Sequence, residues 1–156
     1  MIKPILNPAT CKSCKICCNY TETSLWDIPG FTKEEYIEVI DKFPSMKAIS
    51  YNKNNLYYFK PHKDNSIYLC PFLSENGCKL AALKPFKCKI WPLYVVKNGL
   101  ELYIAKSNVC PNIPKISSQT FKEELYEQYI KIKEIITEHP ELIEINRDFF
   151  ELVIKL

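Results

Sequence analysis

The stretch Cys11-Lys-Ser-Cys14-Lys-Ile-Cys17-Cys18 places four cysteines within eight residues near the start of the chain. Four further cysteines follow singly: Cys70, Cys78, Cys88 and Cys110. Two of these, Cys70 and Cys110, directly precede a proline. Because the chain has only two histidines, the chemistry that the sequence supports best is thiolate chemistry.

The spacing within the N-terminal run is typical of a metal site. A Cys-x-x-Cys turn brings two sulfurs to one side of a tight loop, where one cation can bind both. Cys11, Cys14 and Cys17 form Cys-x2-Cys-x2-Cys, and a remote Cys-Pro is available as a further ligand, as in the bacterial ferredoxin run. The match is partial, because Cys18 follows Cys17 immediately. Adjacent side chains tend to point in different directions, so we predict that this pair does not serve one centre together.

The simplest division of the eight cysteines is into two sets of four, the N-terminal run and the four single cysteines. Ligands could equally be mixed between the two sets. The predicted metal ligands are Cys11, Cys14, Cys17, Cys18, Cys70, Cys78, Cys88 and Cys110. Nearby lysines would offset the negative charge of the thiolates and lower the thiol pKa values; these are Lys12, Lys15, Lys79, Lys87 and Lys89.

A disulfide scaffold is the alternative use of an even number of cysteines. The N-terminal stretch Met1–Pro8 has no apolar core of the kind that a signal peptide needs, so export is not predicted. Disulfides are rare in cytosolic proteins outside hyperthermophiles. The sequence therefore favours metal binding over disulfides and predicts a cytoplasmic protein.

The same cysteines carry a resemblance to a known family. The run Cys11 to Cys18, then Cys70-Pro-Phe-Leu, Cys78, Lys84-Pro85-x2-Cys88 and Trp91-Pro92, resembles the YkgJ-type cysteine-cluster family. The family pattern is CxxCxxCC, then CPFL, a further Cys, RPxxCxxFP and a late Cys-Pro, and it covers about residues 11 to 111. Its members are described as zinc- or iron-chelating proteins. The family is also similar to the cysteine-rich part of flagellin lysine N-methylases, which implies an iron–sulfur centre.

The chain departs from the family pattern at four positions. Lys84 replaces the arginine, Trp91 replaces the phenylalanine, Ala81 replaces a common tyrosine, and Lys15 replaces the glycine of the first cluster. These changes spare the metal ligands. The resemblance therefore implies metal binding here, and it does not carry over an activity that needs the arginine. The methylases are also much longer, and their full catalytic apparatus has no counterpart in this chain.

Length and composition limit the class of protein. With 156 residues, 47% of them hydrophobic, we predict a single domain over 1–156, with ligands within 11–110 and a helical C-terminal extension over 118–156. No apolar run approaches the roughly 20 residues of a membrane span, so the prediction is a soluble protein without a membrane partner. The net charge is +3, and Arg147 is the single arginine among 21 basic residues. A nucleic-acid surface would normally use arginine, so no nucleic-acid partner is predicted.

Local signals predict helices and strands. Thr32-Lys-Glu-Glu35 is a capping box that opens a helix to about Phe43. A hairpin with strands around Ile49–Tyr51 and Leu56–Phe59 precedes a third strand, 67–69, that leads into Cys70. A second hairpin runs from Leu93 to Ala105 around Asn98-Gly99.

The remaining predictions concern the histidines, Cys88 and the C-terminal part. His62 is predicted in an exposed polar turn, His139 at a helix end, and Cys88 in a turn. Thr120-Phe-Lys-Glu123 is a second capping box, and it predicts a helix to Glu138 that Pro140 ends. A further helix is predicted from near Pro140 towards Val153.

The predicted fold class is α+β, a small single domain of short antiparallel strands and metal-binding loops with C-terminal helices. The predicted function is metal binding, with an iron–sulfur cluster, [4Fe–4S] in form, ahead of zinc. Structural zinc, or a metallochaperone or interaction module with an unidentified protein partner, is the first alternative. A cluster-assisted redox or methyl-transfer enzyme is the second. With three glycines in total and no phosphate loop, dinucleotide fingerprint or histidine–carboxylate pair, the sequence identifies no catalytic site, and it leaves the oligomeric state open.

Overall fold

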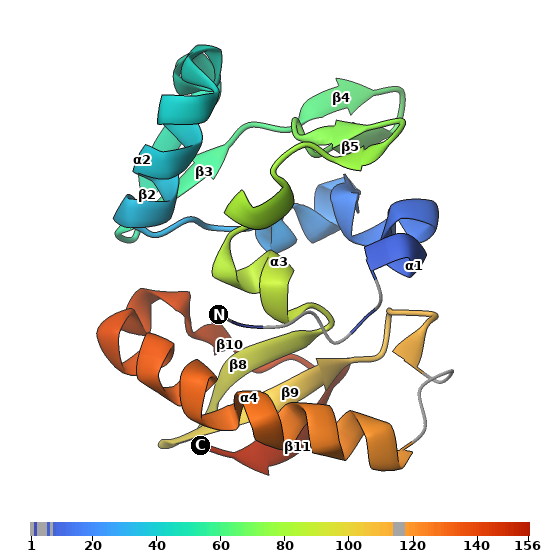
Figure 1. Cartoon of the computed structure of the whole chain (residues 1–156), viewed down its shortest axis with the longest axis vertical. Helices are drawn as coiled ribbons and strands as arrows, with labels where there is room; N and C mark the ends of the chain where they lie inside the picture. Colours follow the sequence, from blue (N-terminus) through green and yellow to red (C-terminus); the bar gives the residue numbers. More distant parts are fainter. Residues whose placement is uncertain (1, 3–5, 7, 114–117) are drawn as a thin grey trace. The chain divides into compact units, whose positions relative to one another are not determined.

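The computed structural model describes residues 2, 6, 8–113 and 118–156. The chain is an α+β protein, as predicted (Figure 1). Its contacts gather into two compact units, which are described separately. The cysteine unit is Pro8–Phe86, and the sheet unit is Lys87–Leu156 together with Met1–Asn7. The single domain over 1–156 stays a prediction.

The cysteine unit consists of short helices and short strands. Its helices are α1 (Pro8–Cys14) and α2 (Lys33–Lys42), with 3-10 turns η1 (Ile16–Cys18), η2 (Glu22–Asp27), η3 (Pro44–Ile49) and η4 (Ala81–Leu83). Its strands are β1 (Asn19–Tyr20), β2 (Ser50–Lys53), β3 (Leu56–Phe59), β4 (His62–Asp64), β5 (Ile67–Leu69), β6 (Leu73–Ser74) and β7 (Gly77–Cys78). The strands form a three-stranded sheet in the order β1-β5-β4 and two hairpins, β2-β3 and β6-β7.

The predicted hairpin β2-β3 is confirmed. Ser50 pairs with Phe59 and Lys53 with Leu56, which leaves Asn54-Asn55 as a two-residue turn. Both asparagines have positive φ, 52° and 64°. Asparagine tolerates this conformation, and tight hairpin turns require it at both central residues.

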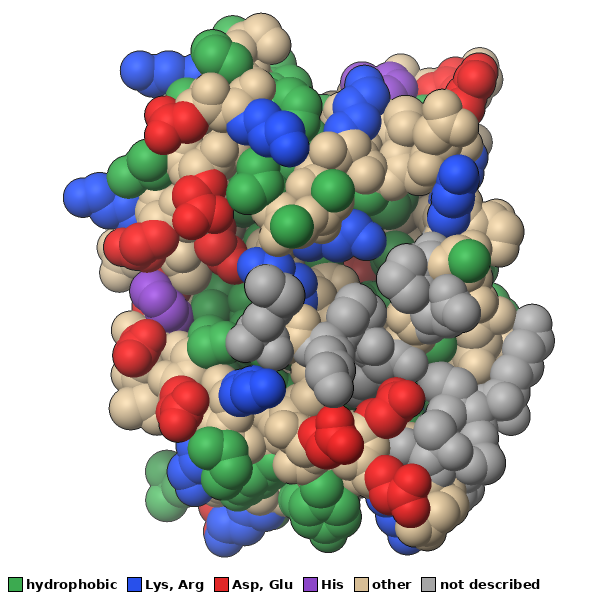
Figure 2. Space-filling model, in the orientation of Figure 1, with side chains coloured by type: hydrophobic (Ala, Val, Ile, Leu, Met, Phe, Trp, Pro, Cys, Tyr) green, Lys and Arg blue, Asp and Glu red, His purple; other side chains and the backbone are tan. Residues whose placement is uncertain are grey.

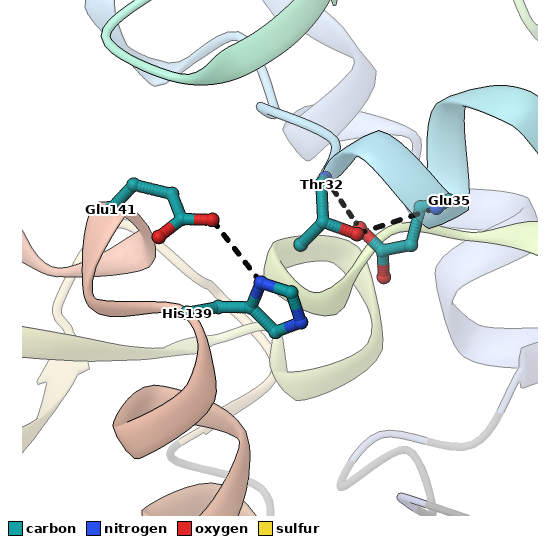
Figure 3. A network of polar contacts seen from close by, with 4 residues as sticks. All are labelled: Thr32, Glu35, His139 and Glu141. Atoms are coloured by element: carbon teal, nitrogen blue, oxygen red, sulfur yellow. Dashed lines mark hydrogen bonds and ion pairs between the residues drawn. The ribbon is translucent and has the colours of Figure 1, made fainter.

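The capping box of α2 is also confirmed. The Thr32 backbone N–H donates to Glu35 Oε2 at 3.1 Å, and the Glu35 N–H donates to Thr32 Oγ1 at 3.3 Å (Figure 3). The other carboxylate oxygen of Glu35 accepts a hydrogen bond from the Phe86 N–H at 2.8 Å. Glu35 therefore joins the start of α2 to the last residue of the cysteine unit.

An apolar core holds the cysteine unit together. Its buried members are Phe31, Val39, Phe59, Phe72 and Leu80. Phe59 makes edge-to-face contacts with Phe31 at 5.0 Å and with Phe72 at 4.9 Å between ring centroids. Cys70 and Cys78 pack against this core as partly buried side chains. The core thus supports the segments that carry these two cysteines.

The sheet unit is built on one mixed sheet. Its elements are α3 (Phe86–Ile90, whose first residue belongs to the cysteine unit), β8 (Leu93–Asn98), β9 (Glu101–Ser107), α4 (Ser118–Glu138), η6 (Pro140–Leu142), β10 (Glu144–Ile145) and β11 (Phe150–Lys155). The strand order is β10-β8-β9-β11, with β10 parallel to β8 and the other pairs antiparallel.

The hairpin β8-β9 and the helix α4 form the centre of the sheet unit. The predicted hairpin is confirmed, and Gly99 in its turn has φ 63°. Figure 1 shows α4 running across one face of the sheet. This helix buries Leu125, Ile132 and Ile136, and the Tyr129 hydroxyl donates to the Lys155 carbonyl oxygen at 3.2 Å.

The C-terminal part differs from the prediction. Pro140 does end the long helix, but the second helix towards Val153 is wrong, because 150–155 form β11 along β9. The segment is short and largely apolar, so its pattern fits either a helix or a strand, and the open edge of β9 decides between them. α4 begins at Ser118, earlier than predicted, and the predicted capping box at Thr120 rests on a side chain outside those described.

Three smaller observations complete the fold. His62 is exposed, as predicted, but it lies in β4 and not in a turn. Cys88 lies in the short helix α3, where a turn was predicted. Within the described part of the chain, no helix is both long enough and apolar enough to cross a membrane.

Candidate metal centre

The N-terminal cysteine run folds as a short helix followed by a tight turn. α1 ends at Cys14, and η1 begins at Ile16 and ends at Cys18. Lys15, between them, has φ 55° and ψ 6°, the left-handed conformation that glycine adopts most easily. This is the position at which the resembling family has glycine. The backbone reversal at Lys15 lets the run turn from α1 into the β1 strand.

The β1-β5 ladder brings Cys18 to Cys70. Asn19 pairs with Leu69 and Tyr20 with Tyr68 in antiparallel register. The same register puts Cys18 opposite Cys70, and the Cys70 N–H donates to the Cys18 carbonyl oxygen at 2.9 Å. Residues directly opposite in an antiparallel pair project to the same face. The sheet therefore places these two sulfurs together, although 51 residues separate them in the chain.

The hairpin β6-β7 presents Cys78. Leu73 pairs with Cys78, and Ser74 Oγ donates to the Gly77 carbonyl oxygen at 2.7 Å in the turn. The Cys78 sulfur accepts hydrogen bonds from the backbone N–H groups of Leu80 and Ala81, two and three residues later. Such N–H···S bonds orient a thiolate and stabilise its negative charge, as outer-shell groups do around metal-bound sulfur.

The helix α1 packs on this hairpin. A Cβ added to Gly77, which has φ 98°, would lie 3.2 Å from Lys12 Cγ. The Lys15 ammonium donates to the Glu75 carbonyl oxygen at 3.3 Å. These contacts hold the N-terminal cysteine run against the turn that carries Cys78.

Hydrogen bonds and charge both favour the thiolate at Cys18. Side-chain hydrogen bonds from Cys17 and Cys70 lower the pKa of Cys18 from 9.0 to about 3, and burial of the thiol opposes them. The positive charges of Lys84 and Lys15 contribute to this lowering of the pKa. Lys15 was among the predicted charge-offsetting lysines. Lys84 was noticed only as a departure from the family pattern, because nothing in its local sequence shows that it approaches Cys18.

At Cys78, the effects that raise the pKa outweigh those that lower it. Burial raises the pKa of the Cys78 thiol above its ordinary value, and the charge on Cys18 raises it as well. This pKa is lowered by hydrogen bonds from the Leu80 and Ala81 N–H groups and by the charge of the Lys84 ammonium. Cys18 and Cys78 are therefore close enough to influence each other, and both lie within reach of the Lys84 charge.

The structure brings together cysteines from the two predicted sets. Cys17 and Cys70 each form a side-chain hydrogen bond with Cys18, and the charge on Cys18 acts on Cys78. We name these four residues the cysteine group. That Cys17 and Cys18 do not serve one centre together stays a prediction, because a hydrogen bond between their side chains does not show whether they bind one metal.

The other predicted ligands lie elsewhere or outside the described side chains. Cys14 is half-buried at the end of α1. Cys88 is half-buried in α3 and Cys110 is buried after β9, both in the sheet unit. The side chain of Cys11 is not among those described. None of the seven cysteines with described side chains is in a disulfide.

No ready-made metal site is formed by the described side chains. Among them, no three or more histidines, cysteines, aspartates or glutamates surround one point with the geometry of metal ligands. The cysteine group has the donor chemistry of a thiolate metal site, without the geometry of metal ligands around one point.

The two histidines have surroundings of their own. His62 is exposed on β4. His139 follows α4, and its Nδ1 lies 3.1 Å from Glu141 Oε1 (Figure 3). The prediction that His139 is a helix-end residue is confirmed, since its N–H donates to the Ile135 carbonyl oxygen at 2.8 Å.

Two surface features do not involve the cysteine group. A groove of about 460 Å³ in the sheet unit is lined by apolar residues such as Leu102 and Ile136 and by Lys133. Figure 2 shows basic and acidic side chains interspersed among the residues that it colours.

Comparisons with known proteins leave the family open. No protein-family model, no curated protein and no solved structure matches the chain. Membership of the YkgJ-type family therefore stays a prediction from the cysteine pattern.

Proposed function

We propose that the protein binds metal through cysteine thiolates, with the cysteine group as the centre of the site. The observation that carries the proposal is the β1-β5 register, which places Cys18 opposite Cys70, a residue far away in the chain, and joins them by a backbone hydrogen bond of 2.9 Å. Side-chain hydrogen bonds from Cys17 and Cys70 to Cys18 add to it. A thiol cluster on ordered backbone serves either metal binding or thiol chemistry. Cys11, Cys14, Cys88 and Cys110 are proposed as further ligands, for this centre or for a second one.

The surroundings of the cysteine group fit a negatively charged metal centre. Lys15 and Lys84 supply positive charge next to Cys18, and the Leu80 and Ala81 N–H groups point to the Cys78 sulfur. Positive charge and N–H···S bonds together stabilise the deprotonated thiolates that a metal requires. The donor set is purely sulfur, which selects zinc, iron or an iron–sulfur cluster over magnesium or calcium.

The metal can take two forms. The Cys-x2-Cys-x2-Cys spacing favours an iron–sulfur cluster of the [4Fe–4S] type. The side-chain hydrogen bonds of Cys17 and Cys70 to Cys18 favour a single tetrahedral ion, because Zn–S bonds of about 2.3 Å bring four sulfurs to within roughly 4 Å of one another. The thiolates around a cubane bind different irons and are held further apart. Zinc is therefore the second candidate, and it would make the protein a structural, interaction or metal-transfer module.

The proposed activity is metal binding, without an assigned reaction. A bound cluster would supply electron transfer, whereas bound zinc would supply structural cross-linking. The residues of this chain would contribute ligands, charge compensation by Lys15 and Lys84, and partial exclusion of water by the aromatic core beside Cys70 and Cys78. Because the described cysteines form no disulfide, we also propose a reducing compartment such as the cytoplasm.

The test is metal and sulfide analysis of protein purified without oxygen, together with its ultraviolet–visible spectrum. A broad visible band with near-equal iron and sulfide identifies a cluster, and zinc without a visible band identifies a zinc site. Protein that contains neither metal, and takes up neither iron with sulfide nor zinc in reconstitution, contradicts the proposal.

Single serine variants locate the ligands. Cys18→Ser and Cys70→Ser are expected to lose most of the bound metal, because both contribute to the sulfur contact at the centre of the group. Ser13→Ala is the matched control, since Ser13 is exposed in the same cysteine run and bonds only to α1 carbonyl oxygens. Equal loss in Cys88→Ser or Cys110→Ser would show that the sheet unit supplies ligands too.

A further inference from the structure

Cys18 and Cys70 form a cross-strand thiol pair at the end of the β1-β5 ladder. The register that pairs Asn19 with Leu69 puts these two cysteines directly opposite each other. Their backbones share one hydrogen bond of 2.9 Å, from the Cys70 N–H to the Cys18 carbonyl oxygen. A side-chain hydrogen bond also joins them, and neither is in a disulfide.

This arrangement meets the requirements of a disulfide. Opposite residues in a hydrogen-bonded antiparallel pair have Cα atoms about 5.5 Å apart. Disulfides span Cα separations of roughly 4.4–6.8 Å. The Cys18 N–H donates to the Lys15 carbonyl oxygen. The pair lies at the end of the ladder, where the backbone can adjust to the dihedral angle of a disulfide.

We propose that Cys18 and Cys70 are an oxidation site, at which a two-electron oxidant of the peroxide class converts the pair into a disulfide. The inference goes beyond metal binding, because it concerns the thiols themselves and requires no metal. Its consequence for metal binding rests on the proposed function. A disulfide removes two thiolates from the cysteine group, so oxidation and metal binding exclude each other.

The reaction balances with hydrogen peroxide as the oxidant. The Cys18 sulfur attacks one peroxide oxygen, the O–O bond breaks, and the departing hydroxide takes the thiol proton and leaves as water. The sulfur is then a sulfenic acid. The Cys70 sulfur attacks it, the S–O bond breaks, and the hydroxyl leaves with the Cys70 proton as a second water. Two thiols and one peroxide give one disulfide and two waters.

The geometry selects Cys70 over the neighbouring thiols as the partner of Cys18. A Cys17–Cys18 disulfide would close a small ring across a single peptide bond, with the strain that distorted disulfide geometry carries. The charge on Cys18 acts on Cys78, but the strand partner of Cys78 is Leu73. Cys70 combines sulfur contact with backbone pairing.

The experiment oxidises the full-length, metal-free, reduced protein with hydrogen peroxide, blocks the remaining thiols by alkylation and maps disulfides by mass spectrometry. Digestion must include cleavage after Glu75, because this residue separates Cys70 from Cys78. We expect a linked peptide pair that contains Cys18 and Cys70, and we expect a dithiol reductant to return it to free thiols. A dominant disulfide between other cysteines, or overoxidation without this link, would overturn the proposal.

Variants separate Cys18 from its neighbours. The linked pair is expected to persist in Cys17→Ser and in Cys14→Ser, and to be lost in Cys18→Ser and in Cys70→Ser. Loss of the link in Cys17→Ser, with an unchanged circular dichroism spectrum, would assign the oxidation site to Cys17 instead. If the disulfide forms but the reduced protein binds no metal, the oxidation site stands and the proposed function fails. If the protein binds metal but no link forms after the metal is removed, the proposed function stands and the oxidation site fails.

Discussion

Lys15 adopts a backbone conformation that favours glycine, at φ 55°. A left-handed conformation costs a residue with a Cβ atom about 1–2 kcal/mol. The structure retains lysine here, and its ammonium supports the thiolate of Cys18 and bonds to the Glu75 carbonyl oxygen. Backbone strain at this position is therefore offset by electrostatic support of the cysteine group.

We predict that Lys15→Gly is more stable to urea than Lys15→Ala by about 1 kcal/mol. Both variants lose the ammonium, so the difference between their free energies of unfolding measures the cost of the left-handed backbone conformation. Both are also expected to bind metal more weakly than the parent protein, because the positive charge beside Cys18 is gone. Equal free energies of unfolding for the two variants would show that the left-handed conformation at this residue carries no strain.

Gly77 supplies a second prediction at the scale of one residue. Gly77→Ala places a Cβ 3.2 Å from Lys12 Cγ at a φ of 98°, so it should lower the free energy of unfolding by about 2 kcal/mol or more. Gly99→Ala is the matched control: its φ is 63° and nothing lies within 4 Å of the added Cβ. Urea denaturation of the two variants should therefore rank Gly77→Ala as the more damaging. The opposite ranking would contradict the packing of α1 on the β6-β7 hairpin.

At the scale of elements, the start of α2 depends on Glu35. This carboxylate accepts hydrogen bonds from the backbone N–H groups of Thr32 and Phe86, whereas the Thr32 side chain contributes only to the capping box. We expect Thr32→Ala to cost about 1 kcal/mol and Glu35→Ala about 2 kcal/mol, since it loses both bonds. Glu38→Ala, on the exposed side of the same helix, should stay within about 0.5 kcal/mol of the parent protein. Thermal and urea unfolding measure these variants. A smaller loss of stability in Glu35→Ala than in Thr32→Ala would show that the hydrogen bond to Phe86 is unimportant.

The helix α4 depends on the face that it buries against the sheet. Ile132 is 1% exposed and Ile130, two residues earlier, is 59% exposed. Ile132→Ala should therefore cost about 2–5 kcal/mol of stability, and Ile130→Ala about 0.5 kcal/mol or less. Comparable losses for the two, measured by urea denaturation, would mean that α4 is rotated about its axis or that Ile130 is covered in solution.

At the scale of the whole molecule, the two units differ in what stabilises them. The sheet unit has a continuous sheet covered by α4, whereas the strands of the cysteine unit are two to four residues long. An isolated two-stranded hairpin is marginally stable at best, so a metal bound here would supply a large part of the stability. The cysteine unit is therefore the part of the chain expected to depend on metal.

We predict that metal removal without oxidation raises amide hydrogen exchange in Pro8–Phe86 far more than in Lys87–Leu156. Mass spectrometry of peptides from loaded and stripped protein measures both units in one experiment. The melting temperature should fall at the same time, because metal-binding free energy is folding free energy at such sites. Equal protection in both states would contradict a metal-dependent fold, and a uniform rise would place ligands in both units.

Local sequence signals determined much of the fold class. The capping box at Thr32, the two-residue turn Asn54-Asn55 and the turn at Gly99 each depend on a few adjacent residues, so α2 and both hairpins could be predicted. The C-terminal strand β11 could not, because its short apolar pattern fits two structures and only the open edge of β9 selects one.

For the cysteines too, the sequence determined one part of the result and the tertiary structure the other. Their number and spacing, by themselves, determined that thiolate chemistry is the candidate function, since such spacing places sulfurs on tight turns. Which sulfurs meet was decided by the tertiary structure: the β1-β5 register joins Cys18 to Cys70, and the turn after η4 brings Lys84 within range of their charge. Strand register and long-range charge act between residues far apart in the chain, so no local pattern records them.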